Sequence, residues 1–364
     1  MKTVTENENG WGIKMAEQQV MFGTYTRRGS EGVYTASLDL EKGQLHDAKL
    51  LFPIGSPTYT VLSQAGFLYA VARQNGQGPT GGEGGFAVYD FKHPDAPKQI
   101  QTWLTPDASE AYLAIDEKRQ LLLAANYHLS TLTVFKIHAD GTVTQTDQYL
   151  AQGQGPRPEQ NKAHVHFANL TPDGRVAIVD LGSDLVTVFD LSDAGALTLA
   201  GTYQTGTGYG PRHLRFNPTH PEYVYVLGEL SSLISVVKYD AATAEMILEK
   251  TYPTIPNEWT AHNGAAAIRV SDDGRFVYVS NRGHNSLAVF AVSDDGSRLT
   301  QIQSVPTQGE FPRDFNIALS GRYVVVANQN TDNVTVFARD EKTGLLTETQ
   351  KDFSVPEAVR VMFY

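Results

Sequence analysis

A unit of roughly fifty residues recurs seven times along the chain, and this repetition limits the possible folds more than any other feature. Each copy has a turn, a short β-branched or aromatic run, a polar residue and a second run that ends near Val-Phe. The clearest copies are DEKRQLLLAANYHLSTLTVFKI (116–137), PDGRVAIVDLGSDLVTVFDL (172–191), DDGRFVYVSNRGHNSLAVFAV (272–292) and SGRYVVVANQNTDNVTVFARD (320–340). The polar residue of each copy lies 47–54 residues after the previous one, at Thr24, Arg73, Asn126, Asp180, Glu229, Asn281 and Asn328.

Repeats of this length with several strands each are typical of a β-propeller, whose blades are small antiparallel sheets. We therefore expect an all-β fold: a seven-bladed β-propeller with four-stranded antiparallel blades. Alternating runs such as 276–279 have the composition and period of strands. Asp-Gly pairs at 173–174 and 273–274 supply residues suited to hairpin turns. No window of a dozen residues shows sustained helical periodicity.

The two ends of the repeat pattern complement each other. The last run, 359–364, has no following partner, and the run at 20–23 begins in the middle of a unit. Pairing of these N- and C-terminal strands in one blade would close the ring and hide both strand edges. The even spacing leaves no room for a second domain. We expect residues 1–18 to be a disordered leader and residues 19–364 to form the propeller domain.

Composition and charge exclude several functional classes. The chain has 364 residues, 41% of them hydrophobic, which suffices for a large core, and its formal net charge is −11. An acidic chain argues against a nucleic-acid-binding or anionic-membrane surface. The absence of cysteine excludes disulfides, thiolate zinc sites, iron–sulfur clusters and a cysteine nucleophile. The chain has no signal-peptide pattern or apolar run long enough to span a membrane, so we expect a cytoplasmic protein without a membrane partner.

In a propeller, the inner strands and their loops converge on the mouth of the central channel. Candidate functional residues are those that depart from the repeat consensus toward charged or imidazole groups. Four stretches do so: HVHFANLTPDGR (164–175), GYGPRHLRFNP (208–218) with LGELSS (227–232), 261–276 with SNRGHNS (280–286), and GEFPRDFNIALSGR (309–322). They hold eight arginines, of which Arg212, Arg282 and Arg313 occupy non-turn positions. These three predict a locally positive mouth on an acidic body.

Each candidate also has a purely structural interpretation. His164 and His166 share a face if they lie on one strand, but no third ligand follows at matching spacing, so we expect no metal. Glu229 follows an apolar run, where an unpaired charge is costly, and Arg282 of the next repeat could be its partner in an inter-blade ion pair. The asparagines of the polar column suit strand ends and turns. The glycine-rich segment 76–85 lacks the helix of a phosphate loop and predicts a flexible insertion beside the mouth.

Together these segments resemble the seven-bladed propeller lactonases, a family that includes the propeller type of bacterial 6-phosphogluconolactonase and the fungal carboxy-muconate lactonising enzyme. The resemblance covers residues 20–364, and GPRH, SNRGHNS and FPRDF carry most of it. It implies the propeller fold and a lactonase that opens or closes a lactone ring, without a cofactor. By motif, it places the family's catalytic site on His166, Arg212, Glu229 and Arg282.

We expect His166 to activate a water molecule, Glu229 to orient the site, and Arg212 and Arg282 to stabilise the oxyanion or hold a phosphate. The substrate-binding candidates are His164, His213, His284, Arg313, Asp314 and Asn126. The predicted partner is a small anionic lactone, with 6-phosphogluconolactone the favoured substrate. We expect a monomer or weak homodimer.

Three alternatives stay open at this point. A lactonising cycloisomerase acting on a muconate would use the same arginines for carboxylates. A non-catalytic propeller could serve as a binding platform. A calcium-dependent lactonase would use oxygen ligands from Glu229, Asn126 and Asp180.

Overall fold

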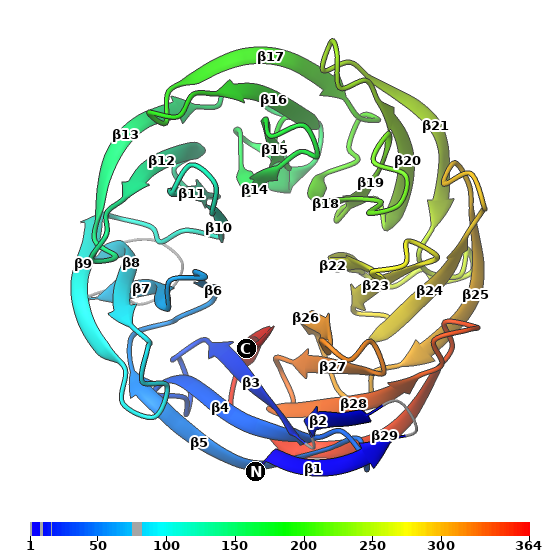
Figure 1. Ribbon diagram of the computed structural model, residues 1–364. Coiled ribbons are helices and arrows are strands. Elements are labelled where there is room, and N and C mark those ends of the chain that lie inside the picture. The colour runs from blue at the N-terminus through cyan, green and yellow to red at the C-terminus, as the bar shows by residue number, and fades with distance from the viewer. Residues whose placement is uncertain (1, 8–9, 16, 75–81) are drawn as a thin grey trace.

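The computed structural model describes residues 2–7, 10–15, 17–74 and 82–364. Seven four-stranded antiparallel sheets surround a central channel, as Figure 1 shows. This confirms the expected all-β, seven-bladed propeller. The one helical segment among the described residues is the single 3-10 turn η1 (Pro158–Gln160). The predicted insertion at 76–85 lies largely outside the described residues, and only its last four residues can be placed.

Each blade begins with its innermost strand and ends with its outermost. The blade that holds both ends of the ring contains β30 (Ala358–Phe363), β3 (Glu17–Thr24), β4 (Gly32–Asp39) and β5 (Gln44–Pro53). The next blades contain β6 (Thr60–Leu62), β7 (Phe67–Gln74), β8 (Glu83–Asp90) and β9 (Lys98–Pro106); then β10 (Tyr112–Asp116), β11 (Leu121–Asn126), β12 (Thr131–Ile137) and β13 (Val143–Leu150). The fourth and fifth contain β14 (Val165–Leu170), β15 (Val176–Asp180), β16 (Leu185–Leu191) and β17 (Leu197–Gln204); then β18 (Pro211–Phe216), β19 (Tyr223–Gly228), β20 (Leu233–Tyr239) and β21 (Met246–Pro253). The last two contain β22 (Gly264–Val270), β23 (Phe276–Arg282), β24 (Ser286–Val292) and β25 (Leu299–Pro306); then β26 (Pro312–Ile317), β27 (Tyr323–Asn328), β28 (Asn333–Arg339) and β29 (Leu346–Ser354).

The burial pattern explains the sequence pattern. The second strand of a blade lies between two neighbouring blades, so both of its faces are covered. Every residue of β11, β23 and β27 is accordingly buried, which requires continuous rather than alternating apolar runs. The outermost strands, such as β13, are mostly exposed and polar. Aromatic contacts join neighbouring blades: the rings of Phe86 on β8 and Phe135 on β12 meet edge to face at 5.2 Å.

A recurring tyrosine also links each of several blades to the next. The hydroxyl of Tyr69 donates to the carbonyl of Gly141, which lies in the outer turn of the following blade. Tyr225 donates in the same way to Gly296, and Tyr278 to Gly344. All three glycines have positive φ, so these turns adopt a backbone conformation that favours glycine.

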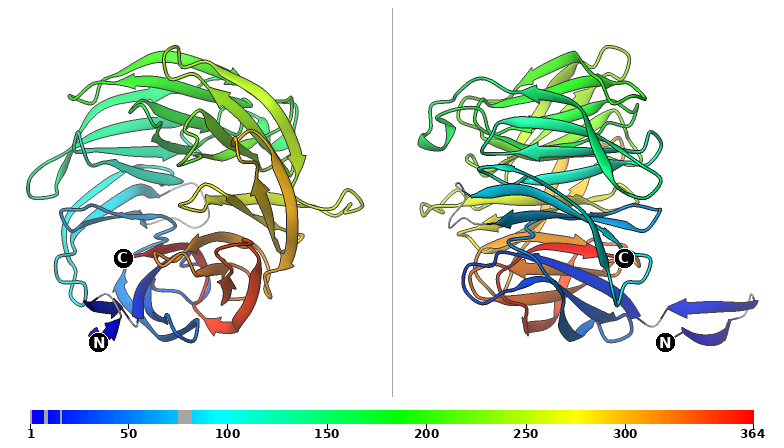
Figure 2. Two further views of the ribbon diagram at one scale, coloured as in Figure 1. Left: turned by 45° about the vertical axis from the view of Figure 1, so that its right-hand side comes forward. Right: turned by 90° about the vertical axis from the view of Figure 1, so that its left-hand side faces the viewer.

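The ring closes as the sequence predicts. β30, from the C-terminus, pairs antiparallel with β3, from the N-terminal part of the chain, with Val20 opposite Phe363 and Phe22 opposite Val361. β3 begins at Glu17, and Gln18 is buried, so the ring begins before the predicted boundary between residues 18 and 19. Before β3, the backbone of β1 (Lys2–Asn7) pairs with that of β2 (Gly10–Met15) in a separate hairpin, which projects from the ring (Figure 2).

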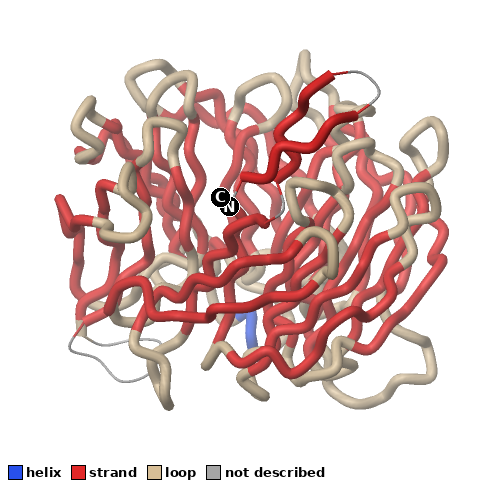
Figure 3. Tube along the Cα trace, turned by 60° about the horizontal axis from the view of Figure 1, so that its bottom comes forward, coloured by secondary structure: helices blue, strands red, loops and turns tan. Residues whose placement is uncertain are grey.

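Figure 3 shows the strands from another side, with loops confined to the two ends of the ring. The inner strands therefore present their starts at one end of the channel and their ends at the other. This arrangement brings residues that begin each inner strand close together, although they lie far apart in the sequence.

Deletion of residues 359–364 should prevent formation of the closed ring. It removes four buried apolar side chains, Val359, Val361, Met362 and Phe363. At about 1.5–3 kcal/mol each, their burial is comparable to the whole stability of a typical protein, about 5–15 kcal/mol. We expect an insoluble product or loss of the cooperative thermal transition, measured by circular dichroism. Deletion of residues 1–15, whose strands pair with each other, is the control and should preserve the transition; an unchanged transition in both variants would contradict closure by β30.

Candidate active site

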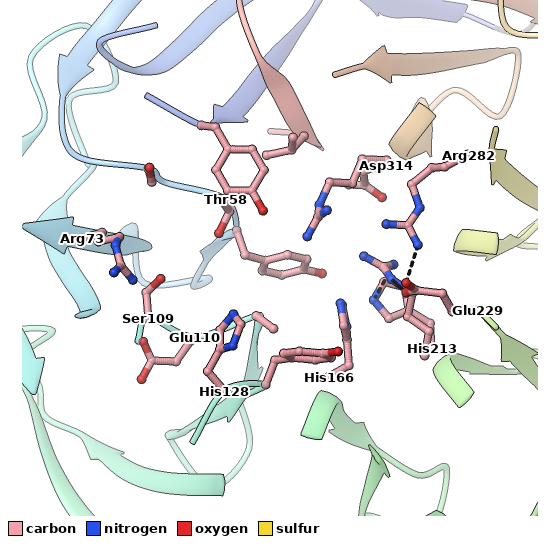
Figure 4. A pocket seen from close by; sticks show the side chains of 18 of the residues that line it. Thr58, Arg73, Ser109, Glu110, His128, His166, His213, Glu229, Arg282 and Asp314 are labelled. Carbon is pink, nitrogen blue, oxygen red and sulfur yellow. Dashed lines mark hydrogen bonds and ion pairs between the residues drawn. The ribbon is translucent and has the colours of Figure 1, made fainter. Parts of the chain in front are cut away.

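The channel contains a cavity, the first cavity, that has a volume of about 260 Å³ and opens at the end where the inner strands begin. Figure 4 shows side chains that converge on this first cavity from several blades. The wall formed by later blades contains His166, His213, Arg212, Glu229 and Arg282. All four predicted catalytic residues therefore line a single cavity.

A β-bulge near the start of the inner strands positions several of these side chains. The register shifts between Val165 and Phe167, between Pro211 and His213, and between Pro312 and Asp314. The extra residue in each case lines the first cavity: His166, Arg212 and Arg313. A bulge breaks the alternation of a strand and redirects a side chain, which is why bulges are frequent beside active sites.

Glu229 joins two arginines from different blades. It follows β19 directly, and its two carboxylate oxygens lie 2.9 Å from Arg212 Nε and 2.9 Å from Arg282 Nη2. Burial alone would raise the pKa of Glu229, but the guanidinium groups of Arg282 and Arg212 outweigh burial and lower it. The carboxylate is therefore ionised at neutral pH. The inter-blade ion pair expected from the sequence is present, and Arg212 is a second partner.

Further hydrogen bonds fix both guanidinium groups. Arg282 Nε donates to the carbonyl of Gly264 at 3.0 Å, and Arg212 Nη1 donates to the carbonyl of Ala266. Arg212 is 3% exposed; burial and the nearby Arg282 lower its pKa to about 9, so it keeps its charge at neutral pH. No described residue accepts a hydrogen bond from Arg212 Nη2 or Arg282 Nη1. These N–H groups are available to a bound molecule.

Two histidines lie beside this cluster. The rings of His166 and His213 are 5.2 Å apart, and His213 Nε2 lies 3.3 Å from Arg212 Nη1, which can donate to it. Burial lowers the pKa of His166 well below its usual range, and the positive charges of Arg212, Arg313 and Arg282 add to this effect. Burial and Arg212 likewise lower the pKa of His213. Both rings are therefore neutral at pH 7.

The opposite wall comes from earlier blades, which the candidate stretches in the sequence did not cover. It includes Tyr59, Arg73, Glu110, Tyr127 and His128, several of which are labelled in Figure 4. Burial raises the pKa of Glu110 to about 7. Arg73 belongs to the polar column of the repeat, so its position in the repeat was the one signal in the sequence that pointed to this wall.

The lining is rich in positive charge, as expected. Five arginines line the described part of the cavity, against three carboxyl groups: Arg27, Arg73, Arg212, Arg282 and Arg313, with Glu110, Glu229 and Asp314. This concentration contrasts with the net charge of −11 for the whole chain. An anionic molecule would be attracted to this mouth although the body repels it.

Three predicted substrate-binding residues do not line the first cavity. The ring of His164 stacks on that of Tyr127, with centroids 4.2 Å apart. Its Nδ1 hydrogen-bonds the backbone carbonyl of Tyr127, and its Nε2 hydrogen-bonds the side-chain oxygen of Asn161. His284 contacts the ring of Trp259 and the hydroxyl of Ser286. Asn126 donates to the carbonyl of Ala108 and accepts from two turn amides.

Asp314 lines the cavity, but other groups occupy its carboxylate. Its oxygens pair with Arg269 at 2.7 Å and with Arg360 at 3.0 Å, and one of them also accepts from the amide of Val361. Asp314 on β26 therefore links the inner strands β22 and β30 of the two neighbouring blades. His213 and Arg313 line the cavity as predicted.

The ligands of the calcium alternative do not come together. Asp180 accepts hydrogen bonds from the amides of His164, Gly182 and Ser183. The side-chain oxygen of Asn126 accepts hydrogen bonds from the backbone amides of the turn that follows it. Of the three residues in that alternative, Glu229 alone lines the first cavity. Among the described residues, no group of three histidine or carboxylate side chains is placed to hold a metal ion.

Comparison with known proteins decides the family. The family model described as "Lactonase, 7-bladed beta-propeller" matches residues 19–363. The chain belongs to the seven-bladed β-propeller lactonase family. It is thus a lactonase, as the resemblance implied.

Individual relatives agree with this membership. The chain is 37% identical to the 6-phosphogluconolactonase of Bacillus subtilis over 297 residues, which is 80% of this chain and 83% of the relative. The crystal structure of a protein from Lactobacillus plantarum has 46% identity and a TM-score of 0.92, covering 96% of this chain and 99% of the other. The periplasmic gluconolactonase of Pseudomonas aeruginosa has 29% identity and a TM-score of 0.87, covering 95% of this chain and 99% of the other.

Nowhere in the described part of the lactonase is there a helix of the length and hydrophobicity needed to span a bilayer. The expected cytoplasmic location and the monomeric or weakly dimeric state stay predictions.

The neutral histidines of the first cavity should make stability depend on pH. Because the pKa of His166 is lower in the folded protein than the usual value of about 6.5, the unfolded chain binds the proton more readily. The free energy of unfolding should therefore fall as the pH drops below about 6.5. In His166→Gln this fall should be shallower, by up to about 1.4 kcal/mol per pH unit.

Urea unfolding at about pH 7.5 and about pH 5.5 measures this difference. His93→Gln, at an exposed histidine, is the control and should retain the slope of the wild type. Equal slopes in His166→Gln and the wild type would show that His166 is not buried as a neutral ring.

Proposed function

We propose that this lactonase hydrolyses a sugar lactone, and that its substrate is 6-phosphogluconolactone, which it converts to 6-phosphogluconate. The observation that carries the proposal is the grouping of a neutral histidine with two carboxylate-bound arginines, each with an N–H group left over, in one positively charged cavity. The named activity of the Bacillus subtilis relative supports the choice of substrate. The excess of arginine supports a substrate with a phosphate group.

In the proposed reaction, His166 accepts a proton from a water molecule while the water oxygen attacks the lactone carbonyl carbon. A neutral imidazole can take this proton, and a histidine already protonated could not. Figure 4 shows the His166 ring directed into the cavity from β14. The negative charge that develops on the carbonyl oxygen needs fixed donors close to it.

Arg212 and Arg282 supply those donors. Glu229 fixes the orientation of both guanidinium groups and lowers the cost of burying two positive charges side by side. Donors held in place before the reaction stabilise an oxyanion without reorganising, which makes this kind of contribution large. When the tetrahedral intermediate collapses, the bond between the carbonyl carbon and the ring oxygen breaks. The protonated His166 then returns its proton to that oxygen.

The remaining arginines suit the phosphate. Arg313 lines the cavity close enough to His166 and Glu229 to lower the pKa of both, and Arg73 lies on the opposite wall (Figure 4). A guanidinium group can donate two parallel hydrogen bonds to a phosphate, which an ammonium group cannot do. Binding the phosphate away from the reacting carbonyl would orient the lactone between the two walls.

Replacement of His166 by alanine should lower kcat for 6-phosphogluconolactone by roughly 10²–10⁴-fold, because the general base is lost. The folded state should survive, since His166 lines a cavity. The rate is measured as acid release, corrected for spontaneous hydrolysis. His93→Ala, at an exposed position, is the control. Wild-type turnover by His166→Ala would exclude it as the base.

Replacement of Arg212 by lysine should lower kcat by roughly 10²–10³-fold, because an ammonium group cannot hold Glu229 and donate to the oxyanion at once. Arg339→Lys is a matched control: Arg339 is also buried and hydrogen-bonds Tyr278 and Gly321, but it does not line the first cavity. It should keep the wild-type kcat even if it loses stability. Product analysis with a muconate substrate, in parallel, would reveal a lactonising activity instead.

A further inference from the structure

A second cavity, of about 460 Å³, lies at the other end of the channel, where the inner strands end. Its wall includes Leu62 on β6, Ile115 on β10, Asn169 on β14 and Asn316 on β26. Tyr59 lines both cavities, and its ring packs against that of Tyr112 in a tilted arrangement, with the ring centroids 4.2 Å apart. This pair of rings, with the Asp314–Arg360 ion pair, separates the two cavities.

Polar side chains of successive blades converge on the second cavity because the repeat places them there. Arg215 lies three residues after the bulge residue Arg212, and Arg269 lies at the corresponding place on β22. In the flanking blades the same place holds Asn169, three residues after His166, and Asn316, three residues after Arg313. All four line the second cavity. Four adjacent blades thus present nitrogen donors, and none presents a carboxylate at this place.

The positive charge of this cluster exceeds its negative charge. Three guanidinium groups, those of Arg215, Arg269 and Arg360, line the cavity, and Arg269 and Arg360 are each 8% exposed. Asp314, which lines the first cavity, forms ion pairs with Arg269 and Arg360. Glu117 supplies the carboxylate in the lining itself, and it accepts a hydrogen bond from the amide of Gln64.

Arg215 has no carboxylate partner among the described residues. Its Nη2 donates to the hydroxyl of Tyr112 at 3.1 Å, and its Nη1 donates to the carbonyl of Leu214. Arg360 Nε is buried and has no hydrogen-bond partner among the described residues. Burial would raise the pKa of Tyr112, yet the guanidinium groups of Arg215, Arg269 and Arg360, with a hydrogen bond from Tyr59, lower it.

We propose that the second cavity binds a small oxyanion with two negative charges, phosphate or a phosphomonoester, through Arg215, Arg269 and Arg360 with Asn169 and Asn316. An uncompensated buried charge is costly, so a counter-ion that enters from solvent stabilises the folded protein. Guanidinium and amide N–H groups are the donors that phosphate oxygens accept. The site is separate from the lactone chemistry, since none of the five residues lines the first cavity.

Isothermal titration with inorganic phosphate and with methyl phosphate, in separate experiments, tests the proposal. Arg215→Gln should weaken binding at the second cavity by roughly 10-fold or more, because it removes a charge-assisted hydrogen bond to the anion. Arg215 is chosen because it is partly exposed and takes no part in the Asp314 network. Arg313→Gln, in the first cavity, is the matched control and should retain this binding event.

Asn169→Asp provides a second, independent variant. It places a carboxylate where the bound anion is expected, so it should raise the melting temperature without phosphate and abolish the further rise that phosphate gives the wild type. Tighter binding of inorganic phosphate would identify the free ion as the ligand, and tighter binding of methyl phosphate would identify a phosphomonoester. The proposal is overturned if the wild type binds neither probe. It is also overturned if Arg215→Gln and Asn169→Asp bind phosphate as the wild type does. Neither readout depends on lactonase activity, so the two proposals can fail separately.

Discussion

Every blade of this lactonase needs a neighbour on both sides, and this requirement governs the rest of the structure. The second strands β11, β23 and β27 are buried along their whole length, so an isolated blade would expose apolar surface on two faces. Only a closed ring covers all seven blades. Closure depends on β30 and β3, which come from opposite ends of the chain. The stability of any one blade is therefore a property of the complete ring.

The same rigid ring gives the first cavity its chemistry. Bulges at equivalent places in several inner strands bring one residue from each to the mouth, and the identity of that residue decides its role. It is an imidazole at His166 and a guanidinium at Arg212 and Arg313. Buried charges of like sign would repel one another, and Glu229 between Arg212 and Arg282 offsets this repulsion. A scaffold common to a whole family can thus carry a site specified by a few side chains.

Much of this could be predicted from the sequence because the repeat is regular. The spacing of the polar column predicted seven blades. Departures from the consensus indicated the stretches that hold His166, Arg212, Glu229 and Arg282, and the resemblance to the lactonase family singled out these four residues. The sequence could not reveal the bulges. Simple alternation puts His164 and His166 on one face, but the shift between Val165 and Phe167 breaks the alternation, and His164 stacks on Tyr127 instead.

Other residues of the two cavities could not be identified from the sequence for a different reason. Arg215 and Arg269 lie in stretches that drew attention, yet their place three residues after a bulge becomes meaningful only when the blades are assembled. Tyr59 precedes the three-residue strand β6 and Glu110 precedes β10, so both lie in loops outside the runs that mark the repeat. The partners of Asp314 come from β22 and β30, more than forty residues away in each direction. Pairings of that kind depend on the ring geometry and leave no local pattern.

The blade shared by β30 and β3 has one more implication. Because those two strands meet without a peptide link, the ring tolerates a gap in its covalent path at that blade. The remaining blades have the same four-stranded architecture, so the fold does not require the gap to lie in this blade rather than in another. A gap placed between two strands of another blade would leave the channel and its cavities with the same walls.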